Sequence, residues 1–405
     1  MINFWKAYPA TWARARAMRD QAGRWHRQGL LSAGQHAAIE AAYPIEYYRP
    51  AWPVRVGLFL FAWLGMALAG AFLAMVTYSG SGDHDASPAA IGCLMTIGCL
   101  GLLWWFIREQ KSYYSGLDSA LLYGGLGSAI GTLWYLFEAH HSQTGYGSSY
   151  SPLTSTLLLS LTLVILLAAV VYYADPLVAA CAYVAAGLLV LALLASLPSG
   201  SPRAGILVLS GVAISFGAAA LALHHYLRAR VDADYYAPAL LVLKVLALAT
   251  IYLGGNYFVV REAGPAALAP TGQVPLAPVF YVFTAMVPLL YLYLGLRRAD
   301  RVLLLLGLLA LGFSLFTLRH YHSVMPPEWA ATLGGLVLIG GAGFGLRYLR
   351  PQRHHLTSEP DDEPRFFNLE SLVVAETAAV PTGPPAPGFA FGGGQSGGGG
   401  ATGQF

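Results

Sequence analysis

The sequence predicts an all-α, polytopic membrane protein with about ten transmembrane helices, and three observations lead to this fold class. First, 56% of the 405 residues are hydrophobic and only 11% are charged, whereas soluble domains carry about 25% charged residues. Second, residues 57–78 form an uncharged stretch long enough, at about 1.5 Å rise per residue, to cross a hydrocarbon layer of about 30 Å. Third, similar apolar runs recur along the chain, and none shows the alternating pattern of a membrane β-barrel.

Residues 1–55, before the first apolar run, predict a basic, cytoplasmic helical hairpin. Apolar residues recur every three or four positions over its first helix, which places on one face Trp12, Ala15, Met18, Ala22 and Trp25. We expect Gly29 to end this helix in the left-handed conformation that glycine tolerates. Ser32 and Gln35 then have the spacing of a capping box, which begins a second helix ending near Tyr43.

The segment GRWHRQGLLSAGQHAAIEAAYP contains the pattern W-x-x-x-G-L-L-S-x-x-Q, from Trp25 to Gln35. This segment resembles the N-terminal hairpin of a widespread family of predicted multi-pass membrane proteins of bacteria, whose domain has no assigned function. The resemblance covers this segment and the general layout that follows it. It implies a hairpin followed by many membrane spans, and it implies no catalytic chemistry.

Ten apolar segments follow the hairpin within a predicted transmembrane domain of residues 56–348. We place them at residues 57–78, 88–107, 117–137, 153–173, 176–197, 204–227, 236–255, 276–296, 302–318 and 328–346. The fourth and fifth segments are separated only by the sequence Tyr173-Ala174-Asp175-Pro176. We therefore expect a tight turn at this position.

The distribution of positive charge predicts the orientation of the spans. Lysine and arginine concentrate in the short loops on the cytoplasmic side of a membrane. With the hairpin on that side, all 23 lysines and arginines lie there except Arg203, Arg261 and Arg319 and the intramembrane Lys244. This bias predicts ten spans with both termini cytoplasmic, and we expect the chain in a bacterial inner membrane.

Residues 349–405 differ sharply in composition from the preceding spans. They run from an acidic SEPDDEPR segment into a tail dominated by proline and glycine. Segments of this composition bury too little apolar surface to offset the loss of chain entropy on folding. We therefore predict a disordered cytoplasmic tail.

Lys244 is the one basic residue placed inside a predicted span. That span begins at residue 236, so helix rise places Lys244 about 12 Å below the interface, deeper than a lysine side chain reaches by extending toward water. A charge at this depth requires a partner, and we expect Asp118, near the start of the third span. The pair is a candidate for transport or ion coupling; the alternatives are a structural ion pair and an interfacial lysine.

Small residues in two of the spans allow two interpretations. The span of Lys244 ends in Gly254-Gly255-Asn256, and Gly127 and Gly131 stand four residues apart in the third span. Small residues at such spacing permit close packing of membrane helices. The alternative is a broken helix that lines a substrate site, as in transporters built from two halves, although no matching pair of interrupted segments occurs in the two halves of this chain.

Histidines concentrate in three loops predicted on the outer side of the membrane. The candidate metal ligands are His84, His140, His141, His320 and His322, with Asp83, Asp85 and Glu138 nearby. Imidazole together with carboxylate suits zinc or copper, but the spacing within each loop is not diagnostic. The alternatives are histidines at the level of the lipid headgroups and an outer surface that responds to acidic pH. The sequence indicates no other cofactor.

Three functions remain open on the sequence alone. It contains no P-loop, Rossmann glycine pattern, nucleophile elbow, HExxH or kinase signature, so we predict no catalytic residue and do not expect an enzyme. The basic hairpin favours anionic lipid headgroups as partners, and its second helix lacks base-reading side chains, so we expect no nucleic acid. The leading hypothesis is a non-enzymatic membrane scaffold or sensor whose two ends bind cytoplasmic proteins. The alternatives are a transporter or channel for ions or small molecules, and a metal-handling membrane protein.

Overall fold

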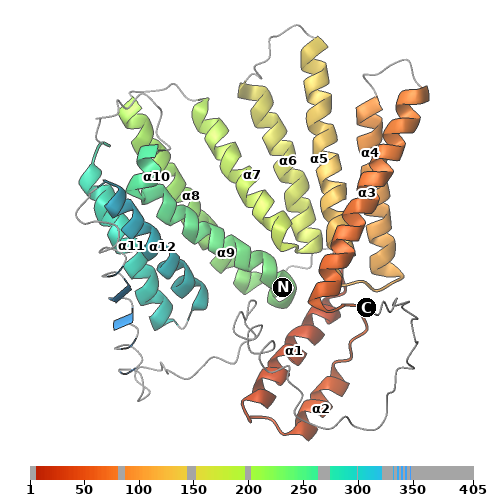
Figure 1. Ribbon diagram of the computed structural model, residues 1–405, viewed down its shortest axis with the longest axis horizontal. Helices are drawn as coiled ribbons and strands as arrows, with labels where there is room; N and C mark the ends of the chain where they lie inside the picture. The colour runs from red at the N-terminus through yellow and green to blue at the C-terminus, as the bar shows by residue number, and fades with distance from the viewer. Residues whose placement is uncertain are drawn as a thin grey trace, which may run out of the picture. The chain divides into compact units, whose positions relative to one another are not determined.

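The computed structural model describes residues 6–80, 87–143, 152–196, 202–262, 274–298 and 300–321, together with single residues between 332 and 347. Every regular element within these ranges is an α-helix, and nine of the helices are long and apolar enough to cross a membrane (Figure 1). The predicted all-α, polytopic fold class is therefore confirmed for the described part of the chain. The predicted tail, residues 349–405, lies outside it.

The nine membrane-spanning helices begin and end near the boundaries predicted for the first nine spans. They are α3 (Trp52–Gly80), α4 (Ser87–Arg108), α5 (Leu117–Gln143), α6 (Pro152–Tyr173), α7 (Pro176–Ala195), α8 (Pro202–Arg230), α9 (Ala233–Gly255), α11 (Ala277–Arg297) and α12 (Arg301–Tyr321). A short helix, α10 (Tyr257–Glu262), follows α9. The tenth predicted span, residues 328–346, lies outside the described ranges apart from isolated helical residues.

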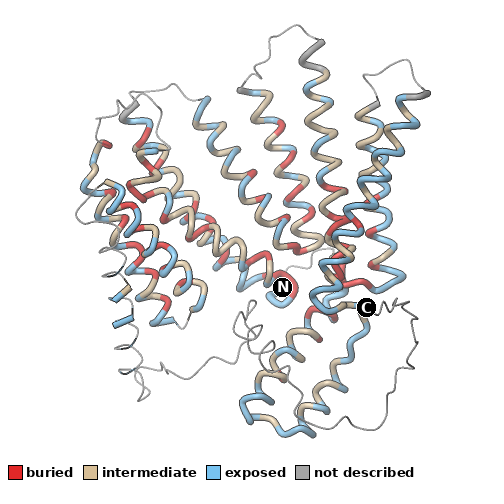
Figure 2. The backbone as a smooth tube through the Cα atoms, in the orientation of Figure 1, coloured by how far each residue is buried: buried red, intermediate tan, exposed pale blue. Residues whose placement is uncertain are grey.

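Large apolar side chains cover the outer surface of these helices. On α3, Phe61, Phe72 and Met75 are 71%, 66% and 73% exposed, and Figure 2 shows exposed segments along most of this helix. Leaving such side chains in water costs about 1.5–3 kcal/mol each, whereas lipid tails solvate them. The chain is therefore an integral membrane protein.

The two helices before the first span form the predicted hairpin, which lies at one end of the bundle (Figure 1). They are α1 (Ala10–Arg27) and α2 (Ala33–Ala42). Gly29 follows the end of α1 with a φ of +72°. The predicted capping box begins α2: the N–H of Gln35 donates to Ser32 Oγ, and the Ser32 N–H donates to Gln35 Oε1 at 2.9 Å. Arg19 joins the two helices through an ion pair with Glu40 at 2.8 Å.

The prediction of a single apolar face on α1 is only partly confirmed. Trp12, Ala15 and Ala22 are buried, whereas Met18 and Trp25 are exposed. The reason is that α2 is short and contributes no buried residue, so it leaves Met18 and Trp25 uncovered. Trp12 instead packs where the hairpin meets the bundle.

Helices that follow one another in the chain pack as antiparallel pairs. The pairs are α4 with α5, α6 with α7, α8 with α9 and α11 with α12. Between α8 and α9, a Cβ atom on Gly217 would lie 2.8 Å from the carbonyl oxygen of Ala247, so glycine permits an approach that any side chain would prevent. Four of the turns between helices, those before α5, α7, α9 and α12, lie at the hairpin end of the bundle.

The glycines predicted to pack the third span are not the ones in close contact. A Cβ atom on Gly127 or Gly131 would meet nothing within 4 Å, whereas one on Gly124 would lie 2.3 Å from the sulfur of Met66, and Gly125 is similarly crowded. The prediction for the first pair is therefore wrong. The close approach of α3 and α4 to α5 falls at Gly124 and Gly125 instead.

Candidate functional site

The residues directly before α1 penetrate the hairpin end of the bundle. The N–H of Ala7 donates to the carbonyl of Tyr172 at the end of α6 at 2.8 Å. Lys6 pairs with Asp232, before α9, at 2.7 Å, and the Tyr8 hydroxyl donates to Asp118 in α5 at 3.2 Å. Three consecutive residues thus bond to α5, to α6 and to the residue that caps α9. We call this contact region the hairpin junction.

Asp118 is a buried carboxylate held by neutral donors. It is 1% exposed and has no ion-pair partner among the described residues. Besides Tyr8, its donors are the hydroxyl of Ser115 at 3.2 Å and the backbone N–H groups of Gly116 and Ser119 at 3.1 and 2.9 Å. These bonds, and the N-terminus of α5, stabilise its negative charge.

Aromatic rings enclose the hairpin junction. The Tyr8 ring stacks on Tyr114 at 5.7 Å between centroids and meets the Tyr113 ring edge-on at 5.2 Å. Trp12 of α1 also contacts Tyr113, at 5.9 Å. Burial raises the pKa of Tyr8 well above its ordinary value, and the negative charge of Asp118 raises it further. Tyr8 therefore remains a neutral hydrogen-bond donor.

A second buried carboxylate, Asp175, occupies the predicted tight turn between α6 and α7. Its Oδ1 atom accepts the N–H groups of Leu177 and Val178 at 2.9 and 3.1 Å, so Asp175 caps α7. The hydroxyl of Tyr123 donates to both of its oxygens at 3.1 Å. Burial raises the pKa of Asp175, and the charge of Asp118 adds to this rise, although the three donors oppose it.

The predicted ion pair between Lys244 and Asp118 is wrong, because Lys244 pairs with Asp300. Asp300 lies in the turn between α11 and α12 and caps α12, accepting the N–H groups of Val302 and Leu303 at 3.1 and 3.4 Å. Burial acting by itself would raise the pKa of Asp300. The hydrogen bond and charge of Lys244, with the two N–H groups, outweigh burial and leave that pKa lowered.

A buried histidine that the sequence analysis did not single out lies on the same helix pair as Lys244. His224 of α8 is 4% exposed, and its Nδ1 lies 2.9 Å from the carbonyl oxygen of Leu240 in α9. Its Nε2 atom is buried and has no hydrogen-bond partner among the described residues. The sequence signal that could have found it is a histidine inside the apolar segment 204–227.

Gly254-Gly255-Asn256 marks a break between α9 and α10. The glycines also pack closely, as the first interpretation predicted, because a Cβ atom on Gly255 would lie 2.1 Å from Phe283. A substrate site at the break stays a prediction. Asn256 is 0% exposed and caps α10, its Oδ1 accepting the N–H groups of Phe258 and Val259 at 3.0 and 3.4 Å. The same oxygen accepts the hydroxyl of Thr317 in α12 at 3.3 Å, and Nδ2 donates to the Tyr252 hydroxyl at 2.9 Å. The break is therefore stabilised by groups of this chain.

Most of the histidine candidates lie outside the described part of the chain. His84 and His322 are outside the described residues, as are the side chains of His140 and His141. His320 is described, and its ring contacts the rings of Phe258, Phe316 and Tyr321 at centroid distances of 5.4, 5.9 and 4.9 Å. Zinc or copper binding thus stays a prediction.

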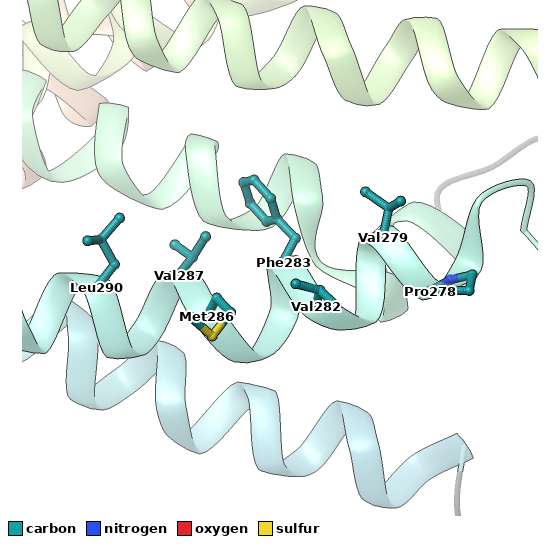
Figure 3. Close-up of a pocket in the computed structure, with 7 residues that line it drawn as sticks. All are labelled: Pro278, Val279, Val282, Phe283, Met286, Val287 and Leu290. Atoms are coloured by element: carbon teal, nitrogen blue, oxygen red, sulfur yellow. The ribbon is translucent and has the colours of Figure 1, made fainter.

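Two hollows on the outside of the described part of the bundle are lined mainly by apolar side chains. One, of about 450 Å³, is lined by residues of α11 alone, including Val282, Phe283 and Met286 (Figure 3). A second, of about 460 Å³, lies among α6, α7, α8 and α9, with Tyr183 and Phe216 in its wall. Neither offers the set of convergent polar groups that a catalytic pocket requires.

The fold and these buried polar contacts define the class of protein: a polytopic integral membrane protein whose N-terminal hairpin is anchored in the bundle. Comparison with protein-family models, with curated proteins and with solved structures finds no match to the chain. The resemblance of residues 23–44 to the hairpin of a bacterial membrane-protein family therefore stays a prediction.

Proposed function

We propose that this protein is a non-enzymatic membrane sensor or scaffold in which the hairpin responds to the packing of the transmembrane helices. The observation that supports the proposal is the hairpin junction: Lys6, Ala7 and Tyr8 bond to α9, α6 and α5 immediately before α1 begins at Ala10. A shift of any of these helices strains a contact that lies within one helical turn of the hairpin.

The contacts of the junction are suited to a reversible change. Each hydrogen bond in such a network contributes about 0.5–1.5 kcal/mol net, so two packings of the junction need to differ by only a few kcal/mol for a ligand or the lipid environment to shift their populations. The charge bias of the loops supports our proposal that the hairpin and tail lie on the cytoplasmic side of a bacterial inner membrane. On that side they meet cytoplasmic proteins.

The coupling is tested by spin-label distances between the tip of the hairpin and a loop of the bundle. Labels at Gln28 and Glu109, in a chain whose three cysteines are replaced, report this distance in lipid nanodiscs. We expect Tyr8→Phe, which removes the hydroxyl and keeps the ring, to broaden the distance distribution. The matched control is Tyr48→Phe, at a side chain that is 55% exposed. Identical narrow distributions in all three proteins would contradict the coupling.

The scaffold role is tested by the proteins that co-purify with the chain. We expect a set of partners with the intact protein that is lost when residues 360–405 are deleted and exposed arginines of the hairpin are substituted. This design keeps residues 6–8, so the junction stays intact. An unchanged set of partners would count against the scaffold role while leaving the coupling measurement to stand on its own.

Transport of ions or small molecules is the second candidate, and two observations favour it: the helix break at Asn256 and the charged pair of Lys244 with Asp300 near a buried histidine. Discontinuous helices and intramembrane charges are typical of transporters. The test is proton flux into proteoliposomes that contain a trapped pH-sensitive dye. Flux that exceeds empty vesicles and is lost in Lys244→Met supports transport, and equal flux in both proteins removes Lys244 from the mechanism.

A further inference from the structure

Three arginines gather at the hairpin end of α3 with too few acidic partners. Arg16 lies on α1, Arg49 on the linker between α2 and α3, and Arg55 in the first turn of α3, and the charges of Arg16 and Arg55 both act on Arg49. Arg16 contacts Asp20 at 3.5 Å, but Asp20 is largely exposed and such pairs contribute little. Neither of the other two has a carboxylate within 4.0 Å among the described residues. We call the three side chains the arginine corner.

Backbone contacts fix the position of the arginine corner. The N–H of Tyr48 donates to the carbonyl of Lys111 at 2.9 Å, and the N–H of Tyr113 donates to the carbonyl of Tyr48 at 3.1 Å. The linker that carries Arg49 is therefore paired with the loop before α5. In that loop Gly116 has a φ of +95°, and a Cβ atom on it would lie 2.1 Å from the carbonyl oxygen of Arg55. Linker, loop and α3 thus form one packed unit.

Rings connect this unit to the third arginine. The ring of Tyr47, next to the linker, lies 4.9 Å from that of Tyr113 and 5.7 Å from that of Trp12 on α1. Arg16 follows Trp12 by one helical turn, which places the two on the same face of α1. The hairpin therefore presents Arg16 toward the linker and the start of α3.

The arginine corner is electrostatically unbalanced as it stands. Burial lowers the pKa of Arg49, and the positive charges of Arg16 and Arg55 lower it further. The Nε–H of Arg55 is buried and has no hydrogen-bond partner among the described residues. An anion between the three guanidinium groups would attract all three and offset their mutual repulsion. It would also accept a hydrogen bond from the Nε–H of Arg55.

We propose that the arginine corner binds the phosphate group of an anionic phospholipid headgroup. Guanidinium groups donate pairs of parallel hydrogen bonds to phosphate oxygens. The depth of the site favours a lipid: Trp52, at the first residue of α3, is 67% exposed, and exposed tryptophans at the ends of spans lie at the level of the headgroups. Free phosphate offers the same chemistry from the aqueous side. This site does not depend on the sensor function of the junction.

The test measures lipid binding to the full-length protein in detergent micelles. The probes are dioleoylphosphatidylglycerol, neutral dioleoylphosphatidylcholine and inorganic phosphate, titrated into the wild type and into the double variant Arg49→Gln/Arg55→Gln. We expect the affinity for phosphatidylglycerol to fall about tenfold or more in the double variant, with little change for phosphatidylcholine. The matched control is Arg14→Gln, an exposed arginine of the same hairpin, which should change the affinity less than about twofold.

The inorganic phosphate arm distinguishes the two sources of phosphate. If millimolar phosphate leaves phosphatidylglycerol binding unchanged, the headgroup is the ligand. If phosphate displaces the lipid from the wild type and no longer binds to the double variant, the phosphate site stands but the lipid is overturned as its source. Equal affinities in the wild type, the double variant and the control overturn the site. Should the double variant fail to elute as a single species, Arg49→Gln alone gives the same comparison, because the linker residue is only half-buried.

Discussion

Asp175 and Asp300 occupy the same local position in two parts of the molecule and differ in their third partner. Each begins a helix at the hairpin end and accepts two backbone N–H groups, Asp175 from α7 and Asp300 from α12. The remaining partner of Asp175 is the neutral hydroxyl of Tyr123, whereas that of Asp300 is the ammonium group of Lys244. The pKa of Asp175 is raised and that of Asp300 is lowered.

The difference teaches that a helix cap does not by itself decide the direction in which the pKa of a buried aspartate shifts. Two N–H groups offset part of the cost of burial at both sites. At Asp175, which is 3% exposed, burial outweighs them and the hydroxyl of Tyr123. At Asp300 the positive charge of Lys244 reverses the balance. The third partner and the depth of burial, which is greater at Asp175, together determine the sign of the pKa shift.

The largest effect on stability is expected for Asp300→Asn. This change leaves the charged Lys244, which lies within a membrane-spanning helix, without its ion-pair partner. The amide still caps α12, so the loss isolates the ion pair. We expect a destabilisation of about 3 kcal/mol, the usual cost of removing one member of a buried pair, measured by reversible unfolding in mixed micelles. The double variant Lys244→Met/Asp300→Asn should recover most of this loss. A double variant as unstable as the single one would show that the charge is not the cause.

An intermediate effect is expected for Tyr123→Phe, which removes the neutral third partner of Asp175. The carboxylate then keeps only its two backbone donors in a buried setting. We expect a loss of about 2 kcal/mol at pH 7, since hydrogen bonds to charged groups contribute about 1.5–3 kcal/mol. Combining Tyr123→Phe with Asp175→Asn should cost less than the sum of the two single changes. Additive losses would mean that the hydroxyl and the carboxylate do not interact.

Much of the fold follows from the sequence because its causes are local. The first nine spans follow from runs of apolar residues, and the cap at Ser32 and the turn at Gly29 follow from the short-range chemistry of those residues. The sequence Gly254-Gly255-Asn256 allowed a helix break for the same reason, as the alternative to close helix packing. In each case the residues that define the feature lie within one or two turns of each other.

The partners of buried charges did not follow from the sequence, because they depend on which helices pack together. Lys244 was assigned to Asp118, yet the packing of α9 places it beside the turn between α11 and α12. One local signal was available: Asp175, Asp232 and Asp300 each stand directly before an apolar segment, where the N-terminus of a helix favours a negative charge. That signal locates the carboxylates and leaves their third partners open.

A smaller effect is expected for Tyr8→Phe, because Asp118 keeps three other donors when this hydroxyl is lost. We expect a loss of about 1 kcal/mol in the free energy of unfolding, half or less of the effect at Tyr123. The comparison with Tyr48→Phe, which removes an exposed hydroxyl, corrects for the change in residue type. A loss at Tyr8 that equals or exceeds the loss at Tyr123 would indicate that Asp118 depends mainly on the hairpin.

The smallest effect at pH 7 is expected for Asp175→Asn, and its signature is the dependence of stability on pH. Because the pKa of Asp175 is raised by burial, its contribution to stability is fully present below its unfolded pKa of about 3.9 and is lost as pH rises through the folded pKa. Asp300 has the opposite sign: its lowered pKa gives a contribution that is present above about 3.9 and lost as pH falls. Asp175→Asn should therefore remove the decline of stability on raising the pH from 4, while Asp300→Asn should remove part of the decline on lowering it below 4. Unfolding measured from pH 3 to 8 separates the two, and parallel curves for both variants would show that the third partner does not set the charge state of these caps.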